Sequence, residues 1–252
     1  VGHYKAILKD PNLVSLHTTM MNIPFQVGIH PARWSQVTDI MLEKDPGTAR
    51  CHRLRILALF ESDFNNAKRI LLARKVGHHI EDNDLSPTMQ FGSRPGRQCH
   101  SAVLHKVLSH DIVRLQRSTA AFVENDAIGC YDRLVNDLVF LELRHLGLPI
   151  TVLQSIQASW DNACHHIKTK YGYSGCTYQN SLVKRLFGPG QGSTPGPSLW
   201  SILFCLIAKN LPGDILTMFF KAVNNSLQIK HAGDAFVDDA QLGCTSELPK
   251  GH

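Results

Sequence analysis

Two short segments end in aspartates directly after apolar residues, and together they could bind divalent cations. Residues 120–126 read AAFVEND and residues 234–239 read DAFVDD, so Asp126 closes the first and Asp238 and Asp239 close the second. A strand that ends in carboxylates holds them at the rim of a sheet, where the backbone fixes their positions. Adjacent carboxylates repel one another, and a hard cation such as Mg²⁺, which prefers oxygen ligands, would offset that repulsion. The pattern predicts a metal site if neighbouring strands bring the two segments together.

Carboxylates in such a position could serve a phosphoryl transfer. Two divalent ions about 3.5–4 Å apart can hold the attacking and the leaving oxygen of that reaction. A pair of aspartates is also common at solvated hairpin turns, and for Asp238 and Asp239 taken alone this simpler interpretation is favoured. The prediction of a metal site therefore depends on the segments that accompany the aspartates.

A loop rich in glycine and proline is the first of these companions. Residues 187–200 read FGPGQGSTPGPSLW and lead into an apolar helix. Glycines let the backbone approach a ligand closely, and the N-terminus of the helix favours anions. The loop lacks the Gly-Lys-Ser/Thr of a Walker phosphate-binding loop. An ordinary connection between two elements is the alternative.

A pair of arginines beside a tight turn is the second companion. Residues 90–103 read QFGSRPGRQCHSAV and place Arg94 and Arg97 at the start of a predicted helix. Guanidinium groups suit the recognition of phosphate, although a solvated basic helix start is the simpler alternative. The whole chain has 26 basic and 21 acidic residues, a net charge of +5 that is compatible with binding to nucleic acid.

Composition limits the class of protein. The chain has 252 residues, 43% of them hydrophobic, which is enough for a sizeable buried core. No apolar stretch reaches the roughly 18 residues of a membrane span and no signal segment is found, so neither a membrane protein nor a secreted one is expected. The seven cysteines include no Cys-x-x-Cys pair, which favours reduced thiols in an intracellular compartment. His78, His79, His165 and His166 lack partners at zinc spacing and are expected on the surface.

The elements that must position these residues follow from periodicity and turn signals. The predicted strands cover 38–45, its partner strand 53–60, and 120–126. The predicted helices cover 62–76, 93–116 after its opening turn, 133–146, 150–162 and 198–211. Two further predicted hairpins pair 165–173 with 176–184 and 226–231 with 234–239. Residues 1–30 have weak periodicity and give no prediction. The order is not a strict alternation of strand and helix, which favours an α+β fold with an antiparallel sheet backed by helices.

These segments, in this order, resemble the reverse transcriptase domain of non-LTR (LINE-like) retrotransposons. The similar segments are NDAIGCYDR (125–133, motif A), GPGQGSTPGP (188–197, motif B), FVDD (236–239, motif C), QFGSRPGRQCHSAV (90–103) and LEKDPGTARCHRLRILALFESDFN (42–65). The resemblance covers about residues 34–243. The sequence departs from the family where LRILAL lacks a proline and where Ser93 replaces an aromatic residue.

The resemblance implies an α+β right-hand polymerase fold of fingers and palm, with the thumb missing. Residues 1–33 would be an N-terminal extension and residues 34–118 a fingers-like region. Residues 119–247 would form the palm with motifs A, B and C, parts of 134–190 being interleaved with the fingers.

The resemblance also implies roles for individual residues. Asp126 and Asp238 would bind two Mg²⁺ ions, for which Mn²⁺ could substitute, with Asp239 as the adjacent acid and the carbonyl of Ala127 completing the metal shell. Tyr131 would reject ribonucleotides by a clash at the sugar C2′. The other implied contacts are Gln191, Gly192, Lys44 and Arg55 with the incoming nucleotide, and Arg94 and Arg97 with the template.

The function implied is an RNA-directed DNA polymerase whose partners are an RNA template, a DNA primer and dNTPs. No membrane partner is expected, the compartment would be the nucleus or cytoplasm of a eukaryotic host, and the oligomeric state is left open. Two alternatives stay open: an inactive nucleic-acid-binding remnant of a mobile element, and a metal-dependent nuclease, which would have no use for the Gln-Gly loop or for Tyr131.

Overall fold

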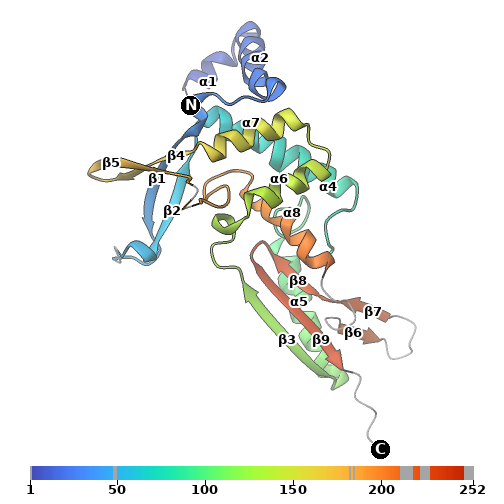
Figure 1. Cartoon of the computed structure of the whole chain (residues 1–252). Helices are drawn as coiled ribbons and strands as arrows, with labels where there is room; N and C mark the ends of the chain where they lie inside the picture. The colour runs from blue at the N-terminus through green and yellow to red at the C-terminus, as the bar shows by residue number, and fades with distance from the viewer. Residues whose placement is uncertain are drawn as a thin grey trace, which may run out of the picture. The chain divides into compact units, whose positions relative to one another are not determined.

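The computed structural model describes residues 2–47, 50–181, 183, 185–210, 218–221 and 228–246. The chain forms two compact units (Figure 1). Unit 1 comprises Val1–Leu71 and Tyr131–Gly196, and unit 2 comprises Leu72–Cys130 and Pro197–His252. Each unit therefore combines two separate stretches of the chain. In the described part of the chain, no helix is both long enough and apolar enough to span a membrane.

Unit 1 contains a four-stranded sheet of mixed direction. Its strands are β1 (Gln36–Glu43), β2 (Leu54–Leu59), β4 (Cys164–Thr169) and β5 (Gly172–Gln179), in the order β2-β1-β4-β5. β1 pairs antiparallel with β2, and β4 pairs antiparallel with β5, so both hairpins predicted for these segments are confirmed. β1 and β4 pair in parallel, which joins the two stretches of unit 1.

A buried carboxylate connects three strands of this sheet. Asp39 of β1 is fully buried, and its Oδ2 lies 3.0 Å from Nδ1 of His165 on β4 and accepts a hydrogen bond from the hydroxyl of Tyr178 on β5. Burial, together with this bond, raises the pKa of Tyr178. His165 is only partly exposed, with 16% of its side chain accessible, because its ring lies against the buried Asp39 carboxylate and stacks on Tyr178.

Helices complete unit 1. They are α1 (Gly2–Ile7), α2 (Pro11–Val27), α3 (Ser62–Lys68), α6 (Asn136–His145) and α7 (Ile150–Asp161), with short 3₁₀ turns at Ala32–Ser35, Cys51–Arg53 and Cys130–Arg133. α2 and α6 both pack against α7. Trp34 is buried and stacks on Phe64 with ring centroids 4.6 Å apart.

The first 30 residues hold two helices that the sequence analysis did not predict. Asp10 caps α2 by accepting a hydrogen bond from the backbone N–H of Asn12, and Pro11 occupies the first helical position. Gly28 ends the helix in the left-handed conformation, with φ of 80°. Aspartate before proline and glycine after the last turn are recognised helix boundaries, so these signals were present in the sequence.

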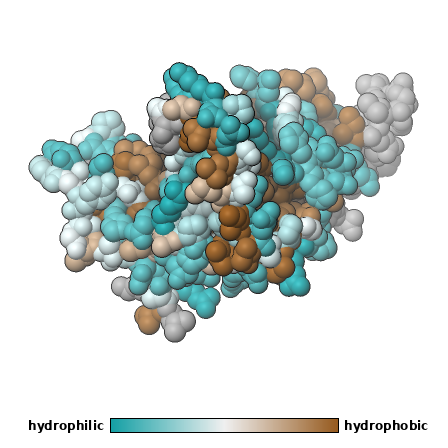
Figure 2. Space-filling model, turned by 90° about the horizontal axis from the view of Figure 1, so that it is seen from above, coloured by the Kyte–Doolittle hydropathy of each residue, from teal (hydrophilic) through white to brown (hydrophobic). Residues whose placement is uncertain are grey.

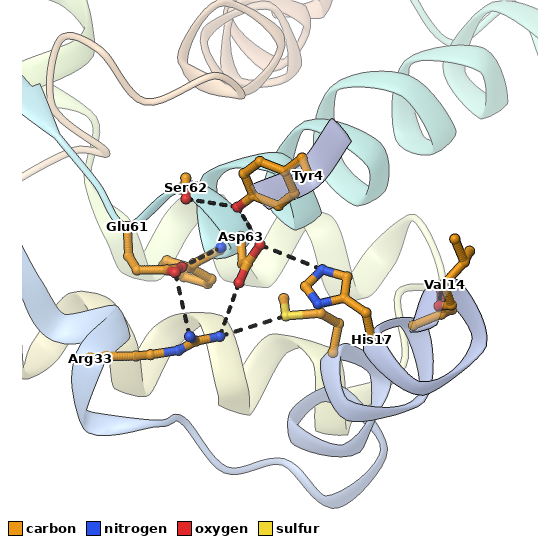
Figure 3. A network of polar contacts seen from close by, with 10 residues as sticks. Tyr4, Val14, His17, Arg33, Glu61, Ser62 and Asp63 are labelled. Carbon is orange, nitrogen blue, oxygen red and sulfur yellow. Dashed lines mark hydrogen bonds and ion pairs between the residues drawn. The ribbon is translucent and has the colours of Figure 1, made fainter. Parts of the chain in front are cut away.

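Asp63 attaches the N-terminal helices to the start of α3 (Figure 3). Its carboxylate accepts hydrogen bonds from the hydroxyl of Tyr4 (2.5 Å) and from Nη2 of Arg33 (3.1 Å), and it lies 3.5 Å from Nε2 of His17. Arg33 also approaches Glu61, whose carboxylate accepts from the N–H of Phe64 and caps α3. One side chain thus collects contacts from α1, α2 and the segment that precedes β1.

Unit 2 is built on an antiparallel sheet with the order β3-β9-β8. Its strands are β3 (Thr119–Asp126), β8 (Gly233–Phe236) and β9 (Asp239–Ser246), and a separate antiparallel pair is formed by β6 (Met218–Lys221) and β7 (Gln228–His231). The helices are α4 (Val76–Asp82), α5 (Cys99–Gln116) and α8 (Gly196–Lys209). α5 packs against β8, and Phe204 of α8 forms a buried cluster with Met89 and Ala235. The predicted antiparallel sheet backed by helices is confirmed.

Two local predictions are wrong. The segment 234–239 pairs with β9 rather than with 226–231, since β7 takes β6 as its partner; residues 226 and 227 lie outside the described part. The helix predicted to end before Gly77 continues through it, because a π-helical segment (Arg69–Lys75) leads directly into α4. The ranges proposed for fingers and palm stay a prediction.

Exposed apolar side chains lie along two helices, one in each unit. On α2 they are Leu13, Leu16, Met20, Ile23 and Val27, and on α5 they include Val103, Leu104 and Val107. Figure 2 shows hydrophobic patches among largely hydrophilic side chains on one face of the molecule. The described residues leave these helix faces without a cover.

We expect Asp63→Ala to loosen the N-terminal helices without unfolding the sheet of unit 1, because three side chains lose a shared acceptor. Local opening of α1 and α2 should become easier by about 1–3 kcal/mol. Hydrogen exchange followed by mass spectrometry would measure it. Asp45→Ala is the matched control, since the contact that Asp45 makes within the described part of the chain is an exposed ion pair with Arg53. Equal exchange in the two variants would contradict the prediction.

Candidate active site

The sheet of unit 2 brings the three predicted carboxylates together. Asp126, the last residue of β3, lies directly opposite Asp239, the first residue of β9. The backbone N–H of Ala127 donates to the carbonyl of Asp238 over 3.2 Å, so the chain after β3 stays beside the turn that contains Asp238. Antiparallel pairing therefore places all three aspartates at one end of the sheet.

None of the described residues gives a hydrogen bond or an ion pair to these three carboxylates. Asp126 and Asp239 are exposed, and Asp238 is half-buried. Like charges directly opposite each other destabilise a pair of strands. A bound cation would remove that repulsion.

The donor chemistry fits a hard divalent cation, since carboxylate and main-chain oxygens are the ligands that Mg²⁺ prefers. Over the ranges that the structure describes, however, no three His, Cys, Asp or Glu side chains are grouped closely enough to hold a metal ion by themselves. Water or substrate phosphate would have to complete the coordination, as is usual for Mg²⁺. Metal binding by Asp126, Ala127 and Asp238 stays a prediction.

Asp126 and Asp239 also line a cavity of about 370 Å³ between the sheet and α5. Nζ of Lys106, the basic side chain in its lining, lies 2.5 Å from Oε1 of Glu124 and is neutralised by it. The hydrogen bond from Lys106 lowers the pKa of Glu124. Lys106 is therefore paired with Glu124, and the described residues show no ion pair from it to Asp126 or Asp239.

The turn that carries Asp238 has a strained backbone. Phe236 pairs with Asp239, which leaves Val237 and Asp238 as a two-residue turn. Val237 has φ of 59°, an unusual value for a β-branched residue. Two residues that the sequence analysis gave no role at this site bind its backbone: the side chains of Gln90 and Trp200.

The glycine-rich loop in unit 1 is ordered by close backbone approaches. A Cβ at Gly188, whose φ is 73°, would lie 1.7 Å from the carbonyl oxygen of Tyr131. A Cβ at Gly192, whose φ is 106°, would lie 2.4 Å from the carbonyl oxygen of Ala58. Both positions therefore require glycine, and Tyr131 and Gly192, two of the predicted nucleotide contacts, lie at this one loop.

Side chains of unit 1 fix the same loop. The N–H of Ala58 donates to the carbonyl of Gln191 over 2.7 Å, and Nε2 of Gln191 donates to Asp132 over 3.2 Å. Burial raises the pKa of Asp132, partly opposed by the hydrogen bond from Gln191. The nearby charge of Lys44 also lowers this pKa, which places Lys44 in the same electrostatic environment. Arg55 is exposed on β2, opposite Leu42 of β1.

Lys68 is a buried cation beneath the loop. Its side chain is fully buried, and Nζ donates to Oγ of Ser193 over 3.2 Å. Nζ lies 3.7 Å from the ring centroid of Phe60 and 4.6 Å from that of Phe64. No described carboxylate pairs with it, and burial lowers its pKa to about 7. The role of Lys68 could not be predicted from the sequence, because this residue lies within an ordinary helical pattern.

The two arginines predicted to hold template differ in environment. Arg94 has a side chain only 7% exposed; it binds both carboxylate oxygens of Glu81 and donates to the carbonyls of Pro87 and Gln90. This pairing lowers the pKa of Glu81. Arg97 is exposed, with its guanidinium 5.4 Å from the ring centroid of Phe91. Contact of either residue with a template stays a prediction.

Comparison with known proteins identifies the fold class. No protein-family model and no curated protein matches the chain. Solved structures do match, and several of them are telomerases, which share a reverse transcriptase-like fold of fingers and palm. The chain has that type of fold.

Three of these structures are telomerases from two Candida species. Telomerase from Candida Tropicalis with the TWJ fragment of telomeric RNA is 12% identical, with a TM-score of 0.51, over 85% of this chain and 36% of that one. The apo form from the same organism is 12% identical, with a TM-score of 0.51, over 87% and 40%. Telomerase from Candida albicans with the TWJ fragment is 10% identical, with a TM-score of 0.50, over 92% and 42%. The chain spans about two fifths of these telomerase chains.

We expect Gly188→Ala to be strongly destabilising, because the added Cβ meets the Tyr131 carbonyl and the residue must also keep a positive φ. Gly147→Ala is the matched control, since Gly147 has φ of 87° but open space around it. The control should lose about 1–2 kcal/mol of unfolding free energy, and Gly188→Ala at least about 2 kcal/mol more. Urea denaturation measures both, and equal losses would show that the close approach is not maintained.

We expect Lys68→Met to stabilise the protein at pH 7. The pKa of Lys68 is about 7 in the folded chain and 10.5 as its ordinary value. Between these values the unfolded chain binds a proton that the folded chain does not, so the unfolding free energy rises with pH.

Lys68→Met should remove the contribution of Lys68 to this pH dependence. At pH 7 the free energy of unfolding should rise by on the order of 2 kcal/mol, a net value that already includes the lost contacts with both rings and with Ser193. Urea unfolding from pH 6 to 10 measures it, with exposed Lys9→Met as control. If the unfolding free energy of the wild type, relative to that of Lys68→Met, falls as the pH rises, the lowered pKa of Lys68 is contradicted.

Proposed function

We propose that the chain is the fingers and palm of an RNA-directed DNA polymerase of the non-LTR retrotransposon type. It would act in the nucleus or cytoplasm of a eukaryotic host. The observation that carries the proposal is the set of three aspartates at one end of the unit 2 sheet, whose carboxylates receive no hydrogen bond or ion pair from the described residues. The reverse transcriptase-like fold supports the same class of reaction.

The proposed reaction joins the 3′-hydroxyl oxygen of a DNA primer to the α-phosphorus of a dNTP. The bond from that phosphorus to its bridging oxygen breaks, and pyrophosphate and a proton are released. Two bound Mg²⁺ ions, or Mn²⁺ in their place, would supply positive charge at the attacking and leaving oxygens. Asp126, Asp238 and the carbonyl of Ala127 would hold these ions, and Asp239 would add negative charge that favours their binding.

Unit 1 would bind the nucleotide. Its ordered loop carries Gln191 and Gly192, and Tyr131 lies against the same loop, where a rigid ring could exclude a 2′-hydroxyl by steric clash. Lys44 and Arg55, at the end of the β1–β2 hairpin, would attract the triphosphate. The RNA component of the telomerase structures supports an RNA template as partner.

The test is primer extension on an RNA template annealed to a DNA primer, with dNTPs and Mg²⁺. We expect extension by the wild type and a loss of roughly 10²-fold or more in Asp238→Asn and Asp126→Asn, which remove metal-binding charge at constant size. Asp111→Asn is the matched control, because Asp111 is an exposed carboxylate on α5 whose ion pair among the described residues is with Arg114.

Each other outcome selects an alternative. Extension that survives in Asp238→Asn would refute the site. No extension by a folded wild type would favour an inactive nucleic-acid-binding remnant. Shortening of a labelled primer, rather than extension, would favour a metal-dependent nuclease.

A further inference from the structure

The turn that presents Asp238 cannot hold its conformation through local preference alone. Val237 occupies the first central position of the turn with φ of 59°. Two-residue hairpin turns with a positive φ at this position favour glycine, asparagine or aspartate. A residue held in such a sparsely populated region costs about 1–3 kcal/mol and persists only when its surroundings enforce it.

The side chain of Gln90 supplies that enforcement. Its Oε1 accepts a hydrogen bond from the backbone N–H of Val237 (3.0 Å), and its Nε2 donates to the carbonyl of the same residue (3.3 Å). The amide thus binds both polar groups of the strained residue as a neighbouring strand would. Nε1 of Trp200 donates a second hydrogen bond to that carbonyl over 2.5 Å.

The backbone around Gln90 fixes the position of this amide. Residues 89–91 run along β8, since the N–H of Phe91 donates to the carbonyl of Ala235 and the N–H of Ala235 donates to the carbonyl of Met89. Oε1 of Gln90 also accepts from the N–H of Gly92 over 2.8 Å. A Cβ at Gly92 would lie 2.4 Å from the nitrogen of Val237, so glycine is required for the segment to lie this close.

The complete burial of the Gln90 side chain makes its contact with the turn specific. Gln90 is 0% exposed, and a buried amide without partners costs roughly 1–3 kcal/mol. Both of its polar atoms bind the backbone of the turn. Arg94 fixes the main chain below it by donating to the Gln90 carbonyl over 3.1 Å.

We propose that Gln90 is a positioning residue for Asp238, and that it acts by fixing the strained turn rather than by touching substrate. The inference rests on the proposed polymerase function, because Asp238 is the metal ligand that the turn presents. Loss of the amide would let Val237 relax toward negative φ, which would rotate the following peptide and move Asp238 away from Asp126.

The activity test uses Gln90→Met, which keeps the length of the side chain and removes its hydrogen bonds. We expect kcat for primer extension to fall about 10–100-fold while the KM for dNTP changes less than about threefold. Val76→Ala, a truncation of a buried side chain in α4, controls for general destabilisation.

A second substitution separates positioning from packing. Val237→Asn places a residue that tolerates positive φ in the turn. If Gln90 acts by enforcing that φ, Gln90→Met should cost at least threefold less kcat in the Val237→Asn background than in the wild type. An equal loss in both backgrounds would overturn the inference.

Hydrogen exchange provides a readout that does not need polymerase activity. We expect Gln90→Met to raise exchange in a peptide covering 234–241 by about tenfold or more, beyond any change in Val76→Ala. Unchanged exchange there would overturn the inference whatever the activity. If Gln90→Met raises exchange at the turn but the wild type extends no primer, the proposed polymerase function fails. The exchange result still decides whether Gln90 holds the turn.

Discussion

The central constraint in this protein is electrostatic: three carboxylates are held at one end of an antiparallel sheet. Strand pairing places Asp126 opposite Asp239 and keeps Asp238 beside the chain that leaves β3. The neighbouring lysine is neutralised by Glu124 and gives no relief. A sheet can maintain this repulsion because its backbone hydrogen bonds fix the strands, and the proposed Mg²⁺ ions would offset it.

In both units a buried polar side chain holds a loop or turn in place. In unit 2 the amide of Gln90 replaces a neighbouring strand and satisfies a strained turn. In unit 1 the ammonium of Lys68 reaches Ser193 from below the glycine-rich loop. Each group is fully buried. Such groups are costly to desolvate, and that cost makes the chosen geometry specific, because any other arrangement leaves them without partners.

Features set by neighbouring residues could be predicted from the sequence, whereas features set by contacts between distant parts of the chain could not. Strand β3 and the aspartate at its end were predictable, since an apolar run that ends in acid is a local pattern. The partner of the 234–239 segment was not, because the segments on either side of it, β7 (QIKH) and β9 (DAQLGCTS), both mix apolar and polar residues, and composition does not choose between them. Gln90 lies in a turn-rich polar segment, and its burial is determined by contacts with Val237, 147 positions away. Helix α2 was missed although its capping residues are local.

The parallel pairing of β1 with β4 also determines the order in which the chain can fold. Gln36 pairs with Cys164, more than a hundred residues later, so the β1–β2 hairpin is synthesised long before its sheet can close. Until then one edge of β1 has unpaired backbone groups that can bind another chain. Contacts of such long range slow folding and leave intermediates prone to aggregation. The open edge of β1 is therefore a place where the growing chain can pair wrongly before β4 has been synthesised.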